Sequence, residues 1–264
     1  MKRFLALIVA ITLTLISTFA FADEEVSLFE IVTPEPLVQD IQTLEQQPID
    51  AIATQAPLEP SPVLQPDGSI VLTISALGDL TVGGDVRKRG ESIFDKELKK
   101  QNGDLSFVTK NVRELLEDDD LTIANFETTL TTAPVYKKNN DFVFSAPPEY
   151  VEILNHGSIE AVSFENNHAN DHGDAGILET QSVLTDAGIV WSTEAHAGFY
   201  TVKGFVIGML SYQTFNGNYP RLQEQVPQDI AGIKQQCDIV IVSYHWGAEL
   251  DYAPNNNQQL LGRL

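Results

Sequence analysis

The chain has 264 residues and a formal net charge of −21, from 37 acidic and 16 basic residues. This length allows one ordinary domain with some extra chain, and no more than two domains. The negative charge argues against nucleic acid as a partner, because such binding depends on Lys and Arg that neutralise phosphates. Cys237 is the only cysteine in the sequence, so an internal disulfide is also excluded.

The N-terminal residues have the pattern of an export signal. Lys2 and Arg3 precede an apolar run from Phe4 to Phe21, and Ala20-Phe21-Ala22 forms a small-x-small cleavage site. We therefore expect residues 1–22 to be a cleaved signal peptide and the protein to be periplasmic or at the cell surface. The alternative is an N-terminal membrane anchor, because the run approaches the length of a membrane-spanning helix.

The segment that follows differs in composition from the rest of the chain. Residues 23–66 contain nine acidic residues, seven of the 13 prolines and no Lys or Arg. Such a segment buries too little apolar surface to offset the entropy of ordering it. We expect a disordered acidic, Pro-rich spacer over residues 23–68, followed by a folded domain over residues 69–264.

Apolar runs alternate with amphipathic stretches from residue 69 onward, which is the pattern of an α/β protein. In chain order we expect a strand over Ile70–Leu77, a helix over Leu105–Glu117, strands over Leu121–Ala124 and Phe142–Phe144, a helix over Glu149–Leu154, a strand over Ile159–Phe164, a helix over Ala175–Ala187, and strands over Ile189–Trp191, Phe199–Val202, Phe205–Ser211 and Ile239–Tyr244. Lys203-Gly204 is expected to form a hairpin turn.

Polar side chains able to bind metal follow four of the expected strands. In chain order they are Asp79, then Asn125 and Glu127, then Asn167 and His168, and finally His245. In open α/β sheets, ligands bind beyond the carboxyl ends of the strands, so these segments can converge on one site. Each residue alone could be a cap or a turn residue, and the four placements together predict the site.

The residue types indicate which chemistry this site would carry. Oxygen donors with imidazole and without thiolate favour Mn, Fe, Zn or Mg over a structural cysteine–zinc site. One or two divalent ions could activate water and bind a phosphoryl oxygen, and a histidine beside them could protonate the leaving group. The residues alone predict a metal-assisted hydrolase.

Four segments combine glycine, amide, carboxylate and histidine residues in specific orders. They are Ala76-Leu77-Gly78-Asp79 with Gly83-Gly84, the ANFETTLT run of residues 124–131, the ENNHANDHG run of residues 165–173, and the HWGAE run of residues 245–249. In this order they resemble the Gly-Asp, ANxE-x-x-L-T, NNHxxDxG and HWGxE motifs of the CapA family of poly-γ-glutamate capsule-biosynthesis proteins. The resemblance covers about residues 70–264.

The resemblance implies a calcineurin-like metallophosphatase fold, in which two packed β-sheets are flanked by helices in four α/β/β/α layers. It also implies a set of metal ligands, namely Asp79, Glu127, Asn167 and His245. His168 would be the general acid. Asn125 is the alternative to Glu127 as the bridging ligand, and Glu127 is favoured because a charged bridge better offsets two dications.

Further residues of the same motifs are expected to support the metal ligands or to shape the pocket. They are Asn125, Asn166, Asp171, Trp246 and Glu249. Asp171 could equally cap the helix that follows it, and Trp246 could equally lie in the core.

The chain departs from the family pattern at two places. Leu80 and Thr81 follow Asp79, where phosphatases of this fold have an Asp-x-His pair, so the number of metal ions stays open at one or two. Family members also continue past HWGxE to a GHxH segment that completes the metal site, and this chain ends at Leu264 without one. We therefore expect a family member truncated at its C-terminus, with the last elements of the fold missing.

Three functions follow from these expectations. The first is an exported protein of capsule biosynthesis with a metal-dependent phosphoesterase-like site that acts on a phosphoester or on capsule polymer. The second is a non-catalytic capsule-assembly or polymer-binding subunit. The third is an inactive fragment. For the first two, membrane proteins of capsule synthesis are expected partners.

Overall fold

The computed structural model describes residues 65, 67–134, 141–215 and 217–264. The expected signal peptide and almost all of the expected spacer therefore lie outside the described residues. No helix in the described part of the chain is both long enough and apolar enough to cross a membrane.

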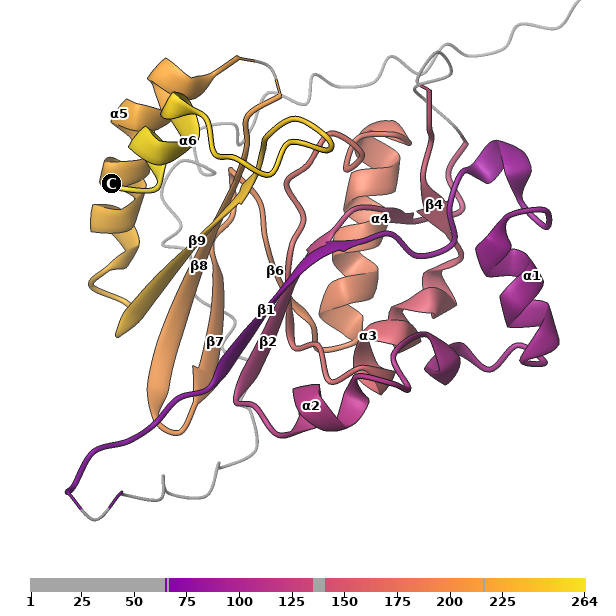
Figure 1. The fold of residues 1–264 in the computed structure, drawn as a ribbon, viewed down its shortest axis with the longest axis horizontal. Coiled ribbons are helices and arrows are strands. Elements are labelled where there is room, and N and C mark those ends of the chain that lie inside the picture. The colour runs from indigo at the N-terminus through magenta and orange to yellow at the C-terminus, as the bar shows by residue number, and fades with distance from the viewer. Residues whose placement is uncertain (1–64, 66, 135–140, 216) are drawn as a thin grey trace, which may run out of the picture. The chain divides into compact units, whose positions relative to one another are not determined.

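The larger of the sheets consists of four parallel strands in the order β1-β2-β5-β6 (Figure 1). These strands are β1 Ile74–Leu80, β2 Leu121–Phe126, β5 Ala161–Ser163 and β6 Val190–Ser192. β2 is completely buried, as expected for a strand covered on both faces. Two short parallel strands, β3 Thr129–Leu130 and β4 Ser145–Ala146, form a separate pair.

A second sheet contains β7 Gly198–Val202, β8 Phe205–Gln213 and β9 Ile239–His245. β7 and β8 are antiparallel, and β9 is parallel to β8. The hairpin expected at Lys203-Gly204 is confirmed, since β7 ends at Val202 and β8 begins at Phe205. Both turn residues have positive φ, 50° for Lys203 and 80° for Gly204. A type I′ hairpin turn requires this conformation.

The helices lie between the strands and after them. They are α1 Ile93–Lys100, α2 Arg113–Glu117, α3 Glu152–His156, α4 Gly173–Asp186, α5 Tyr219–Ile233 and α6 Asn256–Leu261, with 3-10 turns η1 Val86–Lys88, η2 Leu105–Val108 and η3 Pro148–Val151. The mixed α/β class predicted from the alternating pattern is therefore what the structure contains.

Two of the expected elements are wrong. The helix expected over Leu105–Glu117 is divided into η2 and the short α2, in which Leu116 is buried and Leu115 is 70% exposed. η2 begins after Asp104, whose carboxylate accepts a hydrogen bond from Ser106 N at 2.9 Å. The strand expected over Phe142–Phe144 is absent, because Phe144 makes only an isolated bridge with Asp85, and the paired residues are those of β4.

Three apolar clusters hold the elements together, and the alternation of strand side chains produces them. In β2, Ala124 and Phe126 pack with α3 and α4, while Leu121 and Ile123 pack with residues of the second sheet. In β8, Ile207 and Met209 belong to this cluster between the sheets. On the other side of β8, Leu210 and Tyr212 pack with the α5 residues Leu222 and Val226 and with Leu261 of α6.

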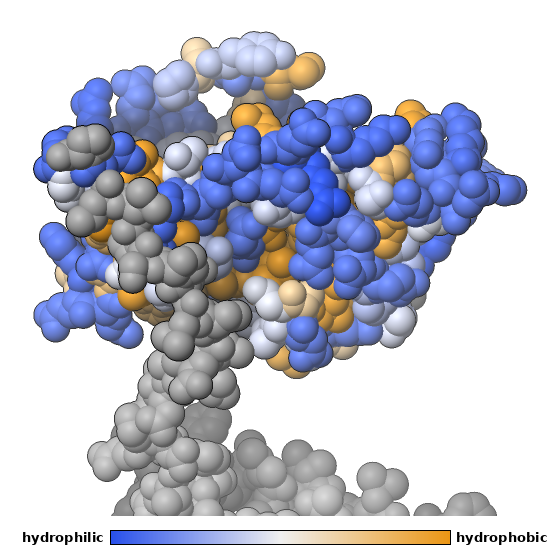
Figure 2. Space-filling model, turned by 90° about the horizontal axis from the view of Figure 1, so that it is seen from below, coloured by the Kyte–Doolittle hydropathy of each residue, from blue (hydrophilic) through white to orange (hydrophobic). Residues whose placement is uncertain are grey.

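The strands β1, β2 and β8 begin at the same end of their sheets (Figure 1). Figure 2 views the molecule from that end. Hydrophilic residues cover most of that face, with separate apolar residues visible between them, as is ordinary for a solvent-facing surface. The residues predicted to bind metal lie at the opposite end, where these strands finish.

Candidate metal centre

A β-bulge in β1 decides the direction in which Asp79 points. Ala76 pairs with Ile123, but the next pair is Asp79 with Asn125, so three residues of β1 span two of β2. Side chains alternate along a strand, so a regular β1 would turn Asp79 away from the face that carries Ile123. Ile123 packs in the cluster between the sheets. The extra residue therefore aims Asp79 into the space between the two sheets.

His245 enters the same space from the second sheet. In β9, Ile239 and Ile241 pack in the cluster between the sheets, and Val240 and Val242 pack towards α5 and α6. The same alternation places His245 on the side of Ile241, at the last position of the strand.

Trp246 lies on the other side of the chain from His245. Its ring is stacked on Tyr244 at a centroid distance of 4.5 Å and an interplanar angle of 5°, within the cluster that includes α5 and α6. Trp246 is therefore a partly buried residue packed against this core cluster, which corresponds to one of its two expected roles. Glu249, also expected at the pocket, is exposed in the loop before α6.

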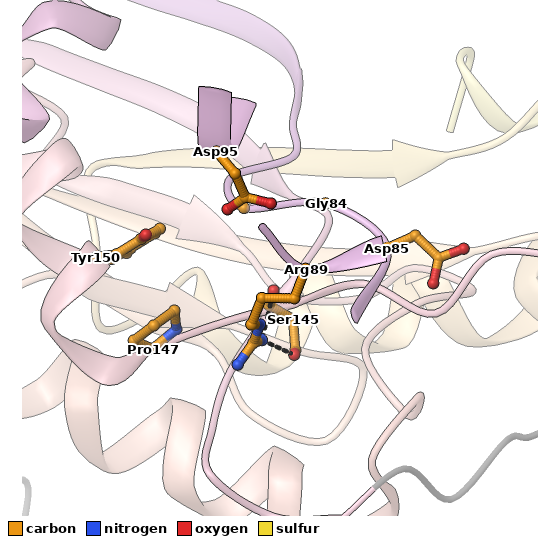
Figure 3. Close-up of a pocket in the computed structure, with 8 residues that line it drawn as sticks. Gly84, Asp85, Arg89, Asp95, Ser145, Pro147 and Tyr150 are labelled. Atoms are coloured by element: carbon orange, nitrogen blue, oxygen red, sulfur yellow. Dashed lines mark hydrogen bonds between the residues drawn. The ribbon is translucent and has the colours of Figure 1, made fainter. Parts of the chain in front are cut away.

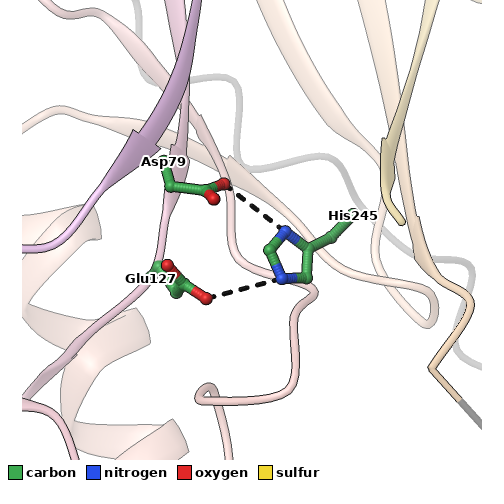
Figure 4. A group of neighbouring side chains, drawn as sticks. All are labelled: Asp79, Glu127 and His245. Atoms are coloured by element: carbon green, nitrogen blue, oxygen red, sulfur yellow. Dashed lines mark ion pairs between the residues drawn. The ribbon is translucent and has the colours of Figure 1, made fainter. Parts of the chain in front are cut away.

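Asp79, Glu127 and His245 form a compact group (Figure 4). His245 Nδ1 lies 3.4 Å from Asp79 Oδ1, and His245 Nε2 lies 3.4 Å from Glu127 Oε1. Each residue offers one donor atom, and the three atoms all lie within 4.8 Å of one another. Three strand ends that are far apart in the sequence thus meet at one point.

Amide side chains complete the surroundings of His245. Asn125 Nδ2 donates to Asp79 Oδ1 at 2.7 Å and lies 3.0 Å from His245 Nδ1. Asn167 Oδ1 lies 2.9 Å from His245 Nε2. Because an amide NH₂ can only donate and an amide oxygen can only accept, these contacts assign the proton of neutral His245 to Nε2. Asn125 therefore bridges two of the three candidate metal-binding atoms, and Asn167 Oδ1 is a fourth such atom beside them.

Asn166 holds the loop that carries Asn167 and His168. Its Nδ2 donates to Asn125 Oδ1 at 3.2 Å and to Phe126 O at 2.9 Å, and its Oδ1 accepts from His168 N at 3.0 Å. Asn166 is 2% exposed, and a buried amide with all these bonds fixes the positions of its partners. The predicted supporting role of Asn166 agrees with these contacts.

The electrostatics of Glu127 favour its charged form. Burial alone would raise the pKa of Glu127. The hydrogen bond to His245, the positive charges that His245 and His168 carry when protonated, and the hydrogen bond from Thr81 together outweigh burial. The pKa therefore lies below its ordinary value of 4.5, so Glu127 is a carboxylate at neutral pH. Thr81 Oγ1 lies 3.3 Å from Glu127 Oε2. Thr81 stands where the family pattern led us to look for histidine, and its hydroxyl supports the carboxylate.

His168 and Asp171 form a buried pair beside this group. His168 Nδ1 lies 2.8 Å from Asp171 Oδ2, which also accepts a hydrogen bond from Phe144 N at 2.9 Å. Asp171 is fully buried, and the ring of Phe144 lies 4.2 Å from that of His168 between centroids. The cap of α4 is His172, so Asp171 does not cap that helix. Its carboxylate instead holds the Nδ1 proton of His168, which leaves Nε2 to exchange protons.

Two aromatic residues of the site were not predicted from the sequence. Phe144 packs on His168, and Phe215, which is 51% exposed, lies 5.0 Å from the His245 ring between centroids. Neither residue belongs to a motif, and the loops that carry them have no periodic pattern. The bulge was also not predicted, although a glycine inside a strand pattern, here Gly78, is a known signal for one.

Comparison with known proteins decides the family. The family model described as bacterial capsule synthesis protein PGA_cap matches residues 73–263. The chain belongs to this family. That result confirms the CapA-type identity predicted from the motifs, and it places all four motif segments inside the match.

Two curated relatives of this PGA_cap protein are CapA proteins. The PGA biosynthesis protein CapA of Bacillus subtilis (strain 168) is 28% identical over 213 residues, which are 73% of this chain and 53% of the relative. The capsule biosynthesis protein CapA of Bacillus anthracis is 25% identical over 223 residues, which are 73% of this chain and 50% of the relative. The chain thus spans about half the length of the curated relatives it matches.

The residues present fit a divalent cation. Two carboxylates, an imidazole and the amide oxygen of Asn167 make a donor set of oxygen and nitrogen without sulfur, which suits Mn, Fe, Zn or Mg. His245 Nδ1, which carries no proton in the assigned tautomer, is held 3.4 Å from a carboxylate oxygen of Asp79. In the structure Asn125 Nδ2 contacts both of these acceptor atoms, and a cation bound to them would take over this role.

Proposed function

We propose that this PGA_cap protein is an exported, metal-dependent phosphoesterase-like hydrolase that acts in capsule biosynthesis. One observation carries the proposal. The group of Asp79, Glu127 and His245, whose donor atoms lie within 4.8 Å of one another, stands beside the buried His168–Asp171 pair. A cation-binding group and a proton-donating histidine are the two parts that metal-assisted hydrolysis requires.

The arrangement of the clusters supports a calcineurin-like fold, with two sheets packed on each other and helices on their outer sides. The cluster between the sheets contains Leu121 and Met209, and the outer clusters contain residues of α3 and α4 on one side and of α5 and α6 on the other. Such a fold places strand ends from both sheets around one centre, as the positions of Asp79 and His245 require.

Asp79, Glu127, Asn167 and His245 would hold one or two divalent ions. When bound, the metal would supply an activated water and a positive charge for the phosphoryl oxygens. Asn125 would orient Asp79 and His245 through its amide, and Asn166 would keep Asn167 in place. His168 would donate a proton from Nε2 to the leaving oxygen, because Asp171 fixes its Nδ1 proton.

The setting of this activity is proposed from the sequence and from the relatives. Residues 1–22 would direct export to the periplasm or the cell surface, with an N-terminal anchor as the alternative. The substrate would be capsule polymer or a phosphoester, and membrane proteins of capsule synthesis would be partners. The curated relatives are named for capsule and PGA biosynthesis, which supports this setting. A non-catalytic polymer-binding subunit is the alternative function that the experiment distinguishes.

The test is turnover of bis(p-nitrophenyl) phosphate, a generic phosphodiester, by the purified protein. Protein stripped of metal with EDTA should be inactive, and added Mn²⁺ should restore turnover. Glu127→Gln should lower Mn²⁺-dependent kcat/KM by about 100-fold or more, because it removes a charged ligand. His156→Ala, which changes a half-buried histidine at the end of α3, is the matched control and should match the unaltered protein.

Two outcomes would contradict the proposal. Turnover that EDTA does not lower would show that the reaction needs no metal. Equal activity of Glu127→Gln and the unaltered protein would show that this group of residues takes no part in the reaction. Saturable Mn²⁺ binding without any turnover would instead favour the non-catalytic polymer-binding subunit.

A further inference from the structure

A hollow borders β4 and the start of α1 and has no role in the reaction proposed above (Figure 3). It contains about 300 Å³ of empty space, part of it open to solvent, and Gly84, Arg89, Asp95, Ser145, Pro147 and Tyr150 line it. Gly83 also borders it with φ of +80°, and a Cβ there would lie only 2.8 Å from Ser145 O. Part of the wall is therefore bare backbone packed against β4.

The hollow is close to His168 through the segment at β4. Ser145 lines the hollow, and Phe144, the residue before it, packs its ring on His168 and donates its N–H to Asp171. The hollow is thus linked to His168 through two consecutive residues, Ser145 and Phe144.

Arg89 has hydrogen-bonding capacity left over in this hollow. Its Nη2 donates to Ser145 Oγ at 2.8 Å and to Ser145 O at 3.3 Å. Among the described residues, no carboxylate forms an ion pair with Arg89, and its Nε and Nη1 donate no hydrogen bond. A guanidinium has five N–H donors in a planar fork that matches a carboxylate. Ser145 holds the guanidinium through Nη2, and the N–H groups of Nε and Nη1 remain available to donate to a ligand.

The carboxylates near Arg89 are already engaged elsewhere. Asp85 pairs with Arg87 at 2.6 Å, and in Figure 3 its carboxylate points away from the other labelled side chains. Asp95 Oδ2 accepts hydrogen bonds from Gly90 N and Ser92 Oγ, both at 2.7 Å. These bonds hold Asp95 at the start of α1, so it lines the hollow without pairing with Arg89.

Tyr150 adds a neutral donor on the other side of the hollow. Burial, and next the negative charge of Asp95, raise the pKa of Tyr150, so its hydroxyl stays protonated. The ring of Tyr150 packs on Phe94 of α1 at 5.6 Å between centroids, which keeps the hydroxyl in position. A ligand oxygen in the hollow would therefore meet both a charged and an uncharged donor.

The charge of the surrounding chain favours an anionic ligand. Residues 87–113 contain eight of the 16 basic residues of the protein and only four of its 37 acidic residues. This stretch includes η1, α1 and η2. In a chain with a net charge of −21, this stretch has more basic than acidic residues, which lessens the repulsion that an anion would meet there.

We infer that this hollow binds a carboxylate group of a ligand through the guanidinium of Arg89. A carboxylate carries one negative charge and matches the planar fork of arginine. Asp95 lines the same hollow, and its negative charge repels a phosphate dianion more strongly than it repels a singly charged carboxylate. The hollow is therefore a subsite for an acidic group, separate from the metal centre.

The test is a titration of the full chain with glutarate in EDTA at low ionic strength, followed by calorimetry or ligand-observed NMR. The unaltered protein should bind glutarate saturably and should not bind glutaramide, its uncharged counterpart. Arg89→Gln should weaken glutarate binding about tenfold or more. Arg89→Lys should be intermediate, because it keeps the charge and loses the fork. Arg113→Gln, which removes an arginine paired with Glu117 on α2, should leave binding unchanged.

The inference is overturned if the unaltered protein shows no saturable binding, or if Arg89→Gln binds glutarate equally well. Tighter binding of inorganic phosphate than of glutarate, with the same dependence on Arg89, would also overturn the assignment to carboxylate. If Arg89→Gln fails to melt cooperatively, glutarate binding by Arg89→Lys is compared with that of the unaltered protein instead. The experiment uses neither metal nor phosphodiester, so its result is independent of the proposed hydrolase activity.

Discussion

Replacing His168 with alanine should lower kcat for a phosphodiester by about 10²–10⁴-fold, the range for loss of a positioned general acid. Mn²⁺ affinity should stay nearly unchanged, because His168 contributes no donor atom to the group of Asp79, Glu127 and His245. The measurement is steady-state turnover at saturating Mn²⁺, with a parallel Mn²⁺ titration. His156→Ala serves as the control for loss of an unrelated histidine.

The choice of substrate separates proton donation from a structural role of His168. The loss should be larger for a diester with a phenol leaving group than for one with p-nitrophenol, because the poorer leaving group depends more on protonation. Asp171→Asn should show a weaker form of the same pattern, since it removes the carboxylate at His168 Nδ1. An equal loss for both substrates, or unchanged kcat in His168→Ala, would refute the assignment of His168 as the acid.

Replacing Asp79 with asparagine should abolish tight Mn²⁺ binding. The bulge in β1 aims this carboxylate into the space between the sheets, 3.4 Å from His245 Nδ1. The substitution removes the charge of the ligand and keeps the bulge unchanged. We expect an affinity loss of about 100-fold or more, at least as large as for the loss of a supporting residue. The measurement is a calorimetric Mn²⁺ titration, with a cooperative melt as proof of folding.

The neighbouring residue offers a matched control for this substitution. A Cβ added at Gly78 would meet no atom within 4 Å, and Gly78 does not have positive φ, so Gly78→Ala should bind Mn²⁺ like the unaltered protein. Asp79→Asn protein that binds Mn²⁺ as tightly as the unaltered protein would remove Asp79 from the set of metal ligands.

The convergence of the site was predictable from the sequence, because parallel strands bring their carboxyl ends to one edge. Asp79, Asn125 and His245 lie at the ends of β1, β2 and β9, and Asn167 follows β5. The apolar runs predicted these four strands, and the structure brings the four side chains together. The motif of residues 165–173 also pointed to His168, whose neighbours Asn166 and Asp171 hold it through buried hydrogen bonds.

Other features depend on contacts that no local pattern contains. The direction of Asp79 depends on a bulge, and a shift of one residue reverses the face of a strand side chain. The roles of Trp246 and Asp171 depended on which neighbour each would meet, Tyr244 for the first and His168 for the second. The helix expected to begin at Leu105 ends after one short turn at Val108 and resumes at Arg113, and no local pattern indicates this break.

The central claim is that a divalent ion binds between the two sheets, and the most direct test is an anomalous difference map from crystals grown with Mn²⁺. The account predicts a Mn²⁺ peak within coordination distance of Asp79, Glu127 and His245, with Asn167 beside it. A Mn²⁺ peak bound by other residues would contradict the account. The absence of a peak at this group in crystals of protein saturated with Mn²⁺ would contradict it as well.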